Sequence, residues 1–143
     1  MKRLFAIVEP IARSSLPPEV KLEHMARAHL ELILRELPIQ KVSVQGLQRH
    51  VLQGGGFRHI KVLQHIVQLR DDYEQMFSEV IEEGTRRQLF DDLPSRLLSK
   101  PFFGALNWVV VWYRPRSLQT DEEIKTIVDA LVAFAMRGIR NGV

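Results

Sequence analysis

The side chains of Arg70 and Tyr73 are the first candidates for a binding site, because they interrupt an apolar helical stripe. The spacing of the apolar residues between 57 and 83 predicts a long amphipathic helix, and both polar groups fall where an apolar residue would be expected. An arginine drawn into an apolar interior needs an anion or several hydrogen-bond acceptors. A bound carboxylate or phosphate would supply them. A carboxylate of the chain itself would also do so, with Tyr73 as ordinary core packing.

A second group of candidates lies in the apolar run FFGALNWVVVWY, residues 102–113. The run has no charged residue, and Asn107 is its one polar side chain among the larger ones. Asn107 could hydrogen-bond across a dimer and fix its register, or it could bond a carbonyl in its own subunit. Trp108 and Trp112 are four positions apart and share one side of a helix. There, core or interface packing competes with a direct ligand contact.

His29 lies on the apolar stripe of a helix predicted over residues 19–37. It is either a core histidine with bonded ring nitrogens or a ligand contact. The other histidine pairs do not suit a metal, because His24 precedes His29 by five positions and His59 precedes His65 by six. The sequence has no H-E-x-x-H, no G-x-S-x-G and no P-loop. We therefore expect no metal, no cofactor and no catalytic residue.

The elements that position these residues are predicted to be helices. Residues 2–13 form a short amphipathic helix, which Pro10 is expected to bend or break. Residues 19–37 form the next helix. Residues 39–53 are either a short helix or a loop, and the glycines at 54–56 form a flexible connection.

The long helix of residues 57–83 is expected to end before Gly84, since glycine tolerates the positive φ that often follows a helix. Residues 85–100 form a connector that contains a short helix. Pro101 is then expected to be the first residue of the next helix, where its missing N–H costs nothing.

The apolar run 102–113 is predicted to be a buried helix. Its valines and aromatic residues have high β-propensity, so a buried strand is the alternative, but no other segment offers a partner strand. Thr120 and Glu123 form a capping box at the start of the last helix, residues 120–139, whose apolar face is unusually wide. The chain is thus predicted to be all-α, with residues 1–143 as a single domain.

Composition and charge narrow the classes of function. A chain of 143 residues can bury one real core, and the absence of cysteine excludes disulfides, thiolate metal sites and a cysteine nucleophile. The basic residues behind the net charge of +3 are scattered and form no cluster that could replace the counterions of a nucleic acid. No stretch is long enough to cross a membrane, and the start lacks a signal-peptide pattern. We expect a cytoplasmic protein that contacts neither DNA nor a membrane.

Two stretches resemble a known family. One is RDDYE at residues 70–74, followed by Phe77 and then by the Glu-Gly pair at 83–84. The other is LNW at residues 106–108 with WYRP at residues 112–115, followed by a capped amphipathic helix. Together they resemble the C-terminal domain of TetR-family transcriptional regulators. They are most similar to the branch that responds to acyl-CoA thioesters or related hydrophobic effectors.

The resemblance implies an antiparallel helical bundle whose last two helices pair with those of a second subunit in a homodimer. The interface residues expected on this basis are Asn107, Trp112, Ile124, Ile127, Val128, Leu131 and Phe134. The effector pocket is expected among the middle helices, lined by Arg70, Tyr73, Phe77, His29 and Trp108. In the family a helix-turn-helix unit precedes this domain. We expect residues 1–143 to lack that DNA-binding unit, and residues 2–13 to correspond to the helix that links it to the core.

The function expected from the sequence is a homodimeric effector-binding domain, in which the ligand shifts the middle helices and so the spacing of the DNA readers. A second hypothesis is a partner protein without a DNA reader that forms mixed dimers with full-length regulators. A third is a small helical enzyme acting on a hydrophobic substrate, with Arg70 holding an anionic group. The third lacks a nucleophile or a poised acid–base pair in the sequence.

Overall fold

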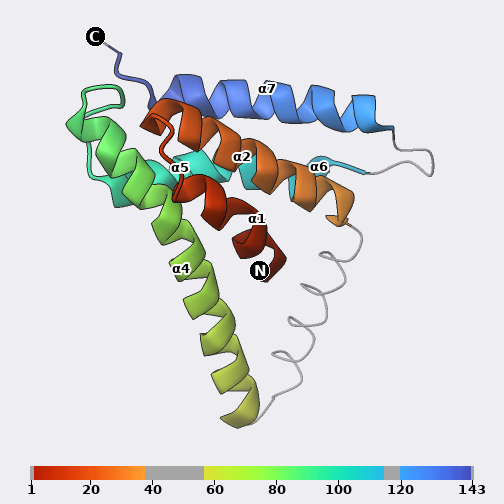
Figure 1. Ribbon diagram of the computed structural model, residues 1–143. Helices are drawn as coiled ribbons and strands as arrows, with labels where there is room; N and C mark the ends of the chain where they lie inside the picture. Colours follow the sequence, from red (N-terminus) through yellow and green to blue (C-terminus); the bar gives the residue numbers. More distant parts are fainter. Residues whose placement is uncertain (1, 38–56, 115–119, 143) are drawn as a thin grey trace.

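The described part of the chain is built from helices, as predicted. A computed structural model describes residues 2–37, 57–114 and 120–142. The helices are α1 (Lys2–Ala12), α2 (Pro18–Arg35), α4 (Phe57–Arg86), α5 (Ser95–Asn107), α6 (Val109–Trp112) and α7 (Asp121–Ile139) (Figure 1). The described ranges contain no strand, and none of their helices could span a membrane. The predictions for residues 39–53 and 54–56 lie outside the described residues.

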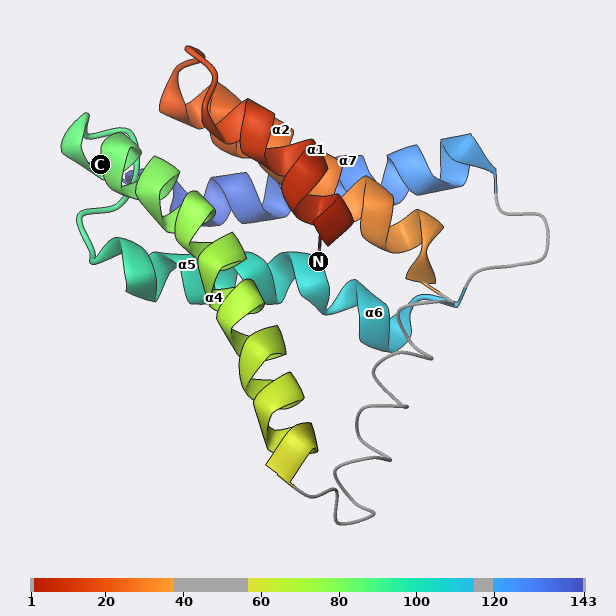
Figure 2. The same ribbon diagram turned by 60° about the horizontal axis from the view of Figure 1, so that its bottom comes forward.

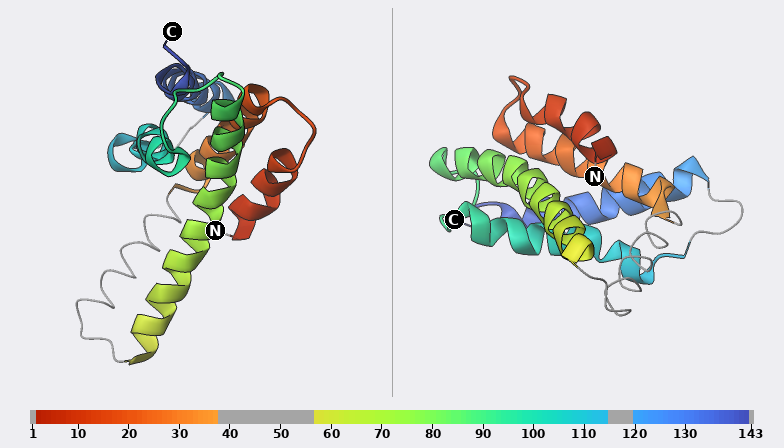
Figure 3. Two further views of the ribbon diagram at one scale, coloured as in Figure 1. Left: turned by 90° about the vertical axis from the view of Figure 1, so that its left-hand side faces the viewer. Right: turned by 90° about the horizontal axis from the view of Figure 1, so that it is seen from below.

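Helix α2 lies at the centre of the bundle. It packs against α1, α4 and α7 and also touches α5. The left view of Figure 3 shows α1 on one side of α2 and α4, with α5 and α7 on the other side. Figure 2 shows α5 and α7 running side by side. The sequence of α2 suits this place because its buried apolar residues lie on more than one side of the helix. They include Leu22, Met25, Ala26, Leu30, Ile33 and Leu34.

Helix α4 is long, and only its second half joins the core. It comprises 30 residues, and its first half projects away from the other helices (Figures 1 and 2). Phe77, Val80 and Ile81 are buried, whereas Ile60 and Val67 are about half exposed. The apolar stripe predicted for this helix is therefore packed only toward its C-terminal end.

Gly84 lies inside α4 and not after its end, so the prediction that it terminates the helix is wrong. The helix continues to Arg86, and the positive φ falls on Gln88 (64°). A Cβ atom at Gly84 would lie 2.2 Å from both Cδ2 and Cε2 of Phe90. Phe90 is almost fully buried, so its ring packs directly on the backbone of α4. A close approach, and not a turn, requires the glycine here.

The apolar run 102–113 is helical, but it is not one continuous helix. Helix α5 begins at Ser95, so Pro101 lies inside it and does not begin it. Helix α5 ends at Asn107, and the single turn of α6 follows Trp108. Phe102, Phe103, Leu106 and Val109 are buried, whereas Trp108, Val111 and Trp112 are half exposed or more. The composition of the run predicted that it is buried. Within one chain this prediction is wrong for the side that carries Trp108, Val111 and Trp112.

Local signals set several helix ends. The Thr120 hydroxyl accepts a hydrogen bond from the backbone N–H of Glu123 at 3.1 Å, which is the cap predicted for the last helix. Pro18 is the first residue of α2, where a proline fits because its missing N–H would have no helical partner. Pro10, by contrast, does not break α1, which continues to Ala12.

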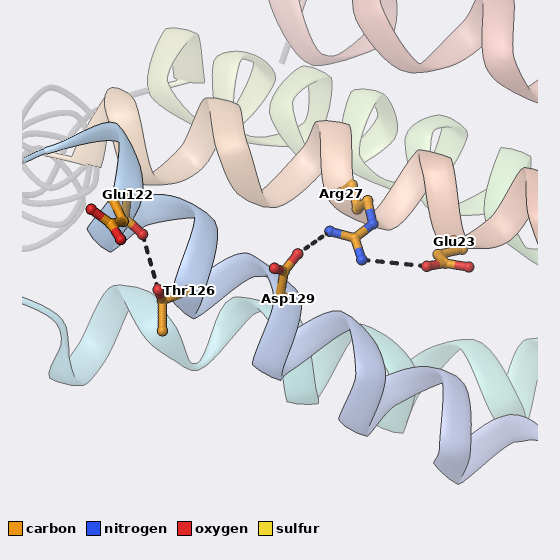
Figure 4. A network of polar contacts seen from close by, with 5 residues as sticks. All are labelled: Glu23, Arg27, Glu122, Thr126 and Asp129. Carbon is orange, nitrogen blue, oxygen red and sulfur yellow. Dashed lines mark hydrogen bonds and ion pairs between the residues drawn. The ribbon is translucent and has the colours of Figure 1, made fainter.

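A polar contact joins α2 to α7 at the surface (Figure 4). The Arg27 guanidinium donates to Asp129 on α7 and, at 3.4 Å, to Glu23 one turn earlier on α2. The bond to Asp129 raises the pKa of Arg27. On α7 the Thr126 hydroxyl donates to the Glu122 carbonyl at 3.0 Å, as it commonly does within a helix. Partly exposed ion pairs add little stability, so we expect only a small contribution from this contact.

Candidate ligand-binding pocket

A cavity of about 310 Å³ lies among five helices. That volume is at the lower end of the range for small-molecule sites. Its walls are mainly apolar, with a few polar groups. The lining residues are Leu4 of α1, His29 and Ile33 of α2, Arg70, Tyr73 and Glu74 of α4, Phe103 and Asn107 of α5, and Val110 and Val111 of α6.

The polar groups of the cavity form a chain of hydrogen bonds centred on His29. The Nδ1 atom of His29 lies 2.7 Å from the Tyr73 hydroxyl, and its Nε2 atom lies 2.7 Å from Oδ1 of Asn107. An amide oxygen only accepts, so Nε2 carries the proton. Nδ1 of the neutral ring must then accept, and the Tyr73 hydroxyl donates to it. Three helices are linked in this way, with His29 on α2, Tyr73 on α4 and Asn107 on α5.

Burial keeps this chain uncharged near neutral pH. Desolvation lowers the pKa of His29 from 6.5 to about 4, and the hydrogen bond to Asn107 offsets part of that effect. Desolvation also raises the pKa of Tyr73 above its usual value. Neither group exchanges protons readily at pH 7. The arrangement is suited to recognising a ligand by hydrogen bonds and not to acid–base catalysis.

A cluster of aromatic rings packs against the side chains that form the hydrogen-bond chain. Phe77 and Phe103 meet at a ring-centroid distance of 4.6 Å, and each presents an edge-to-face contact to the His29 ring. Tyr73 packs edge-to-face against Phe5 of α1, with centroids 5.4 Å apart. Such contacts are favourable geometries for aromatic pairs. They also connect the wall of the cavity to α1.

The charged residues of the cavity lie at its rim. Glu74 accepts from the Lys100 ammonium at 2.8 Å, so its charge is balanced. Arg70 is exposed, and no carboxylate in the described part of the chain forms an ion pair with it. The expectation that Arg70 is drawn into an apolar interior is therefore wrong, because this turn of α4 already lies at the edge of the packed core. Its position still allows the guanidinium to meet a bound anion.

Three of the five residues expected to line a pocket do so together, namely Arg70, Tyr73 and His29. Phe77 is fully buried behind them and touches His29 but not the cavity. Trp108 is 63% exposed and lies outside the lining. Asn107, expected at the dimer interface, instead bonds His29 within its own chain, because the turn at the end of α5 directs it inward.

Sequence reasoning missed the apolar part of the lining. Leu4, Ile33, Phe103 and Val110 line the cavity. In the sequence they look like any other core residue, and only the packing of five helices brings them together. At the polar end, the signal left unused for the pocket was Asn107, an amide in an otherwise apolar run.

A second apolar surface covers the outer side of α5, α6 and α7, and it shares Val111 with the cavity. Along α5, α6 and the Trp108 that joins them, exposed residues recur at helical spacing, namely Leu97, Pro101, Gly104, Trp108 and Val111. On α7 a matching stripe consists of Ile127, Leu131, Phe134 and Gly138. Pro101, Phe134 and Gly138 line one shallow hollow, so the two stripes adjoin. We call these nine residues the α5–α7 face.

Some of the residues predicted for the dimer interface are exposed or partly buried, and others are fully buried in the chain's own core. Phe134 is 64% exposed, Trp112 is about half exposed, and Ile127 and Leu131 are partly buried. Ile124 and Val128 instead lie in the chain's own core, because the other side of α7 faces α2. They are not available to a partner. The wide apolar face of α7 therefore has an inner half and an outer half.

The chain matches a family model described as the tetracyclin repressor-like C-terminal domain over residues 15–139. No curated protein matches the chain at a significant level. Among the residues that the structure describes, no group of three or more His, Cys, Asp or Glu side chains could hold a metal ion.

Solved structures of TetR-family regulators share the fold. A regulator from Thermus thermophilus superposes with a TM-score of 0.74 at 20% identity, over 95% of this chain and 68% of that one. The ketosteroid transcriptional regulator of Mycobacterium tuberculosis gives 0.73 at 22% identity, over 96% and 65%. A family member from Streptomyces coelicolor gives 0.67 at 22% identity, over 97% and 67%. The chain thus spans about two thirds of the length of these structures.

Proposed function

This chain belongs to the tetracyclin repressor-like C-terminal domain family, and on that premise we propose that it is the effector-binding and dimerisation domain of a TetR-like transcriptional regulator. Members of this family are transcriptional regulators and not enzymes. The effector of this domain is a hydrophobic, anionic small molecule such as an acyl-CoA. The domain works in the cytoplasm and makes no DNA contact of its own.

The observation that carries this proposal is the cavity around His29. Mainly apolar walls with a few convergent polar groups are the usual composition of a small-molecule site. His29 and Tyr73 are buried, Asn107 is partly buried, and all three are uncharged, so this hydrogen-bond chain can hold a ligand without taking part in chemistry. Arg70 at the rim supplies a cation for an anionic group.

Dimerisation is supported by the α5–α7 face. Soluble monomers rarely leave a long contiguous apolar surface uncovered. Two adjoining helical stripes that carry small residues between large ones can interdigitate with the same stripes of a second copy. A two-fold pairing of this kind would be isologous, with the same residues contributed by each chain.

The mechanism we propose couples the cavity to α1. Leu4 of α1 lines the cavity, and Phe5 of α1 packs on Tyr73. A ligand that changes the position of Tyr73 would also change the seat of α1. The ligand would shift α1 toward the arrangement that binds the ligand more tightly, by an amount set by the difference in affinity between the two arrangements. In a regulator whose DNA readers are joined through α1, the same shift would alter their spacing.

A cavity-filling variant tests where the ligand binds. Val110→Trp places a large ring in the cavity, whereas the control Val62→Trp adds the same ring on an exposed part of α4. We expect octanoate to raise the melting temperature of the wild type and of Val62→Trp but not of Val110→Trp, with helical content checked by circular dichroism. An equal rise in all three proteins would mean that the ligand binds elsewhere. No rise in any of them would contradict the proposed function for ligands of this class.

A further inference from the structure

The polarity of the hydrogen-bond chain can be followed to its end at Asn107. The Tyr73 hydroxyl donates its hydrogen bond to Nδ1 of His29, and the Nε2–H of His29 donates to Oδ1 of Asn107. The amide nitrogen of Asn107 keeps two N–H donors, and no acceptor in the described part of the chain receives them. Asn107 lines the cavity. The cavity therefore offers donors to a ligand at its polar end.

The charge of the cavity lining points the same way. Its ionisable residues besides Tyr73 and the neutral His29 are Arg70 and Glu74. Glu74 is paired with Lys100, while Arg70 has no ion-pair partner among the described residues. A ligand inside this lining meets one unbalanced positive charge and the two amide donors. Both features favour an acceptor that carries negative charge.

The size of the cavity limits the rest of the ligand. A volume of about 310 Å³ lies at the lower end of the range for small-molecule sites. This is the size of a short aliphatic or single-ring acid. It is far smaller than an acyl group joined to a nucleotide carrier.

We infer that the cavity selects a small free carboxylic acid, whose carboxylate accepts from Nδ2 of Asn107 and faces the Arg70 guanidinium. The apolar body of the acid lies against Leu4, Ile33 and Val110. The inference rests on the proposed function and narrows its ligand from hydrophobic anions in general to one class. Asn107 is the residue that determines specificity, through the donors that its amide presents.

Calorimetric titration of the full chain with probes of equal size tests the class of ligand. The probes are octanoate, 1-nonanol and nonylamine, at about ten non-hydrogen atoms each. We expect octanoate to bind at least about tenfold more tightly than 1-nonanol, because the alcohol loses the charge-assisted hydrogen bond. Nonylamine is expected to bind most weakly, because its positive charge also meets that of Arg70. Octanoyl-CoA is expected to bind more weakly than octanoate. Tighter binding of octanoyl-CoA would overturn the inference in favour of a thioester ligand.

Asn107→Asp is the matched variant. It keeps the oxygen that accepts from His29 but replaces the amide donors with a charged oxygen. Octanoate should lose more than about tenfold in affinity while nonylamine gains. Arg70→Gln, on the exposed rim, should weaken octanoate severalfold and leave 1-nonanol unchanged, which provides a test even where Asn107→Asp fails to fold.

The outcomes separate this inference from the function on which it rests. Equal affinity for octanoate and 1-nonanol, or octanoate binding unaffected by both variants, would overturn the carboxylate assignment and leave an apolar effector site. Binding of none of the probes would overturn the effector site together with the inference.

Discussion

At the residue scale, the polar end of the cavity depends on one buried imidazole. His29 bonds Tyr73 on one side and Asn107 on the other, and both partners lie on different helices from His29. The ring is neutral because burial penalises its charged form. Protonating it would place a donor opposite the hydroxyl hydrogen of Tyr73 and a charge among aromatic rings. The fold therefore resists protonation of His29, and that resistance can be measured.

The first prediction concerns the pH dependence of stability. The pKa of His29 is about 4 in the folded chain and about 6.5 when unfolded, so the unfolded state binds more protons between these values. The free energy of unfolding should rise with pH across this window, be fully regained above about pH 6.5, and fall by up to about 3 kcal/mol as the pH drops toward 4. Urea unfolding at a series of pH values measures it.

The control for this prediction is a second histidine on the same helix. His29→Gln should remove the His29 contribution and flatten the pH dependence, whereas His24→Gln, at an exposed position of α2, should leave it unchanged. Identical slopes for the wild type and His29→Gln would mean that His29 does not titrate differently in the folded and unfolded chain.

At the element scale, the turn after α4 is fixed by contact between a glycine and an aromatic ring. Gly84 allows Phe90 to pack on the helix backbone, and Phe90 forms the isolated bridge with Arg140 after α7. Asn141 also donates its backbone N–H to the Leu89 carbonyl at 3.0 Å. The absence of a side chain at Gly84 therefore lets the turn after α4 pack against the residues that follow α7.

The second prediction is a double-mutant cycle at this contact. Gly84→Ala places a Cβ in the volume of the Phe90 ring, so it should cost about 2 kcal/mol or more of the free energy of unfolding, as overpacked cores do. In a Phe90→Ala background the space is open, and Gly84→Ala should instead be neutral or stabilise by about 0.5–1 kcal/mol through helix propensity. Chemical unfolding of the four proteins gives the coupling. Equal costs in both backgrounds would show that the ring does not set the requirement for glycine.

The positions of the helices could be predicted because their signals are local. Apolar residues at helical spacing located α2 and α7, and the Thr120 cap marked where α7 begins. The end of α4 was predicted wrongly at Gly84, because a sequence does not distinguish a glycine needed for close packing from one needed for a turn. The inner and outer halves of α7 could not be separated either, because both are apolar.

The cavity could be predicted only in part, because its residues meet through tertiary structure. Arg70 and Tyr73 share a helix and were found together from their spacing. His29 and Asn107 are 78 positions apart, and no local pattern connects them. For this reason the sequence could not decide whether Asn107 bonds within its own chain, as it does to His29, or across a dimer. Its polarity was visible in the sequence, but its direction depended on where α5 ends.

At the scale of the whole molecule, the cavity and the α5–α7 face overlap on two helices. The cavity draws on α1, α2 and α4 together with α5 and α6, whereas the face lies on α5, α6 and α7. Helices α5 and α6 contribute to both. A ligand that moves Asn107 or Val110 therefore acts on helices that also carry the α5–α7 face, which provides a physical route between effector and dimer.

The third prediction tests the α5–α7 face. Phe134→Glu places a charge on this face, and an unpaired buried charge should weaken association by more than about a hundredfold. The matched control is Val62→Glu, which adds the same charge at an exposed apolar position of α4 outside the face. Sedimentation equilibrium should find Phe134→Glu monomeric and Val62→Glu unchanged from the wild type. Equal dissociation of the two variants would place the contact elsewhere.

The most direct test of an effector-binding, dimerising domain is native mass spectrometry of the purified wild-type chain with added octanoate. We predict a dimer that takes up one octanoate for each chain, because each chain contributes a complete cavity and a complete α5–α7 face. A monomer at micromolar concentration would contradict the dimer. A dimer that takes up no octanoate would contradict the carboxylate site and leave only the association of the two chains.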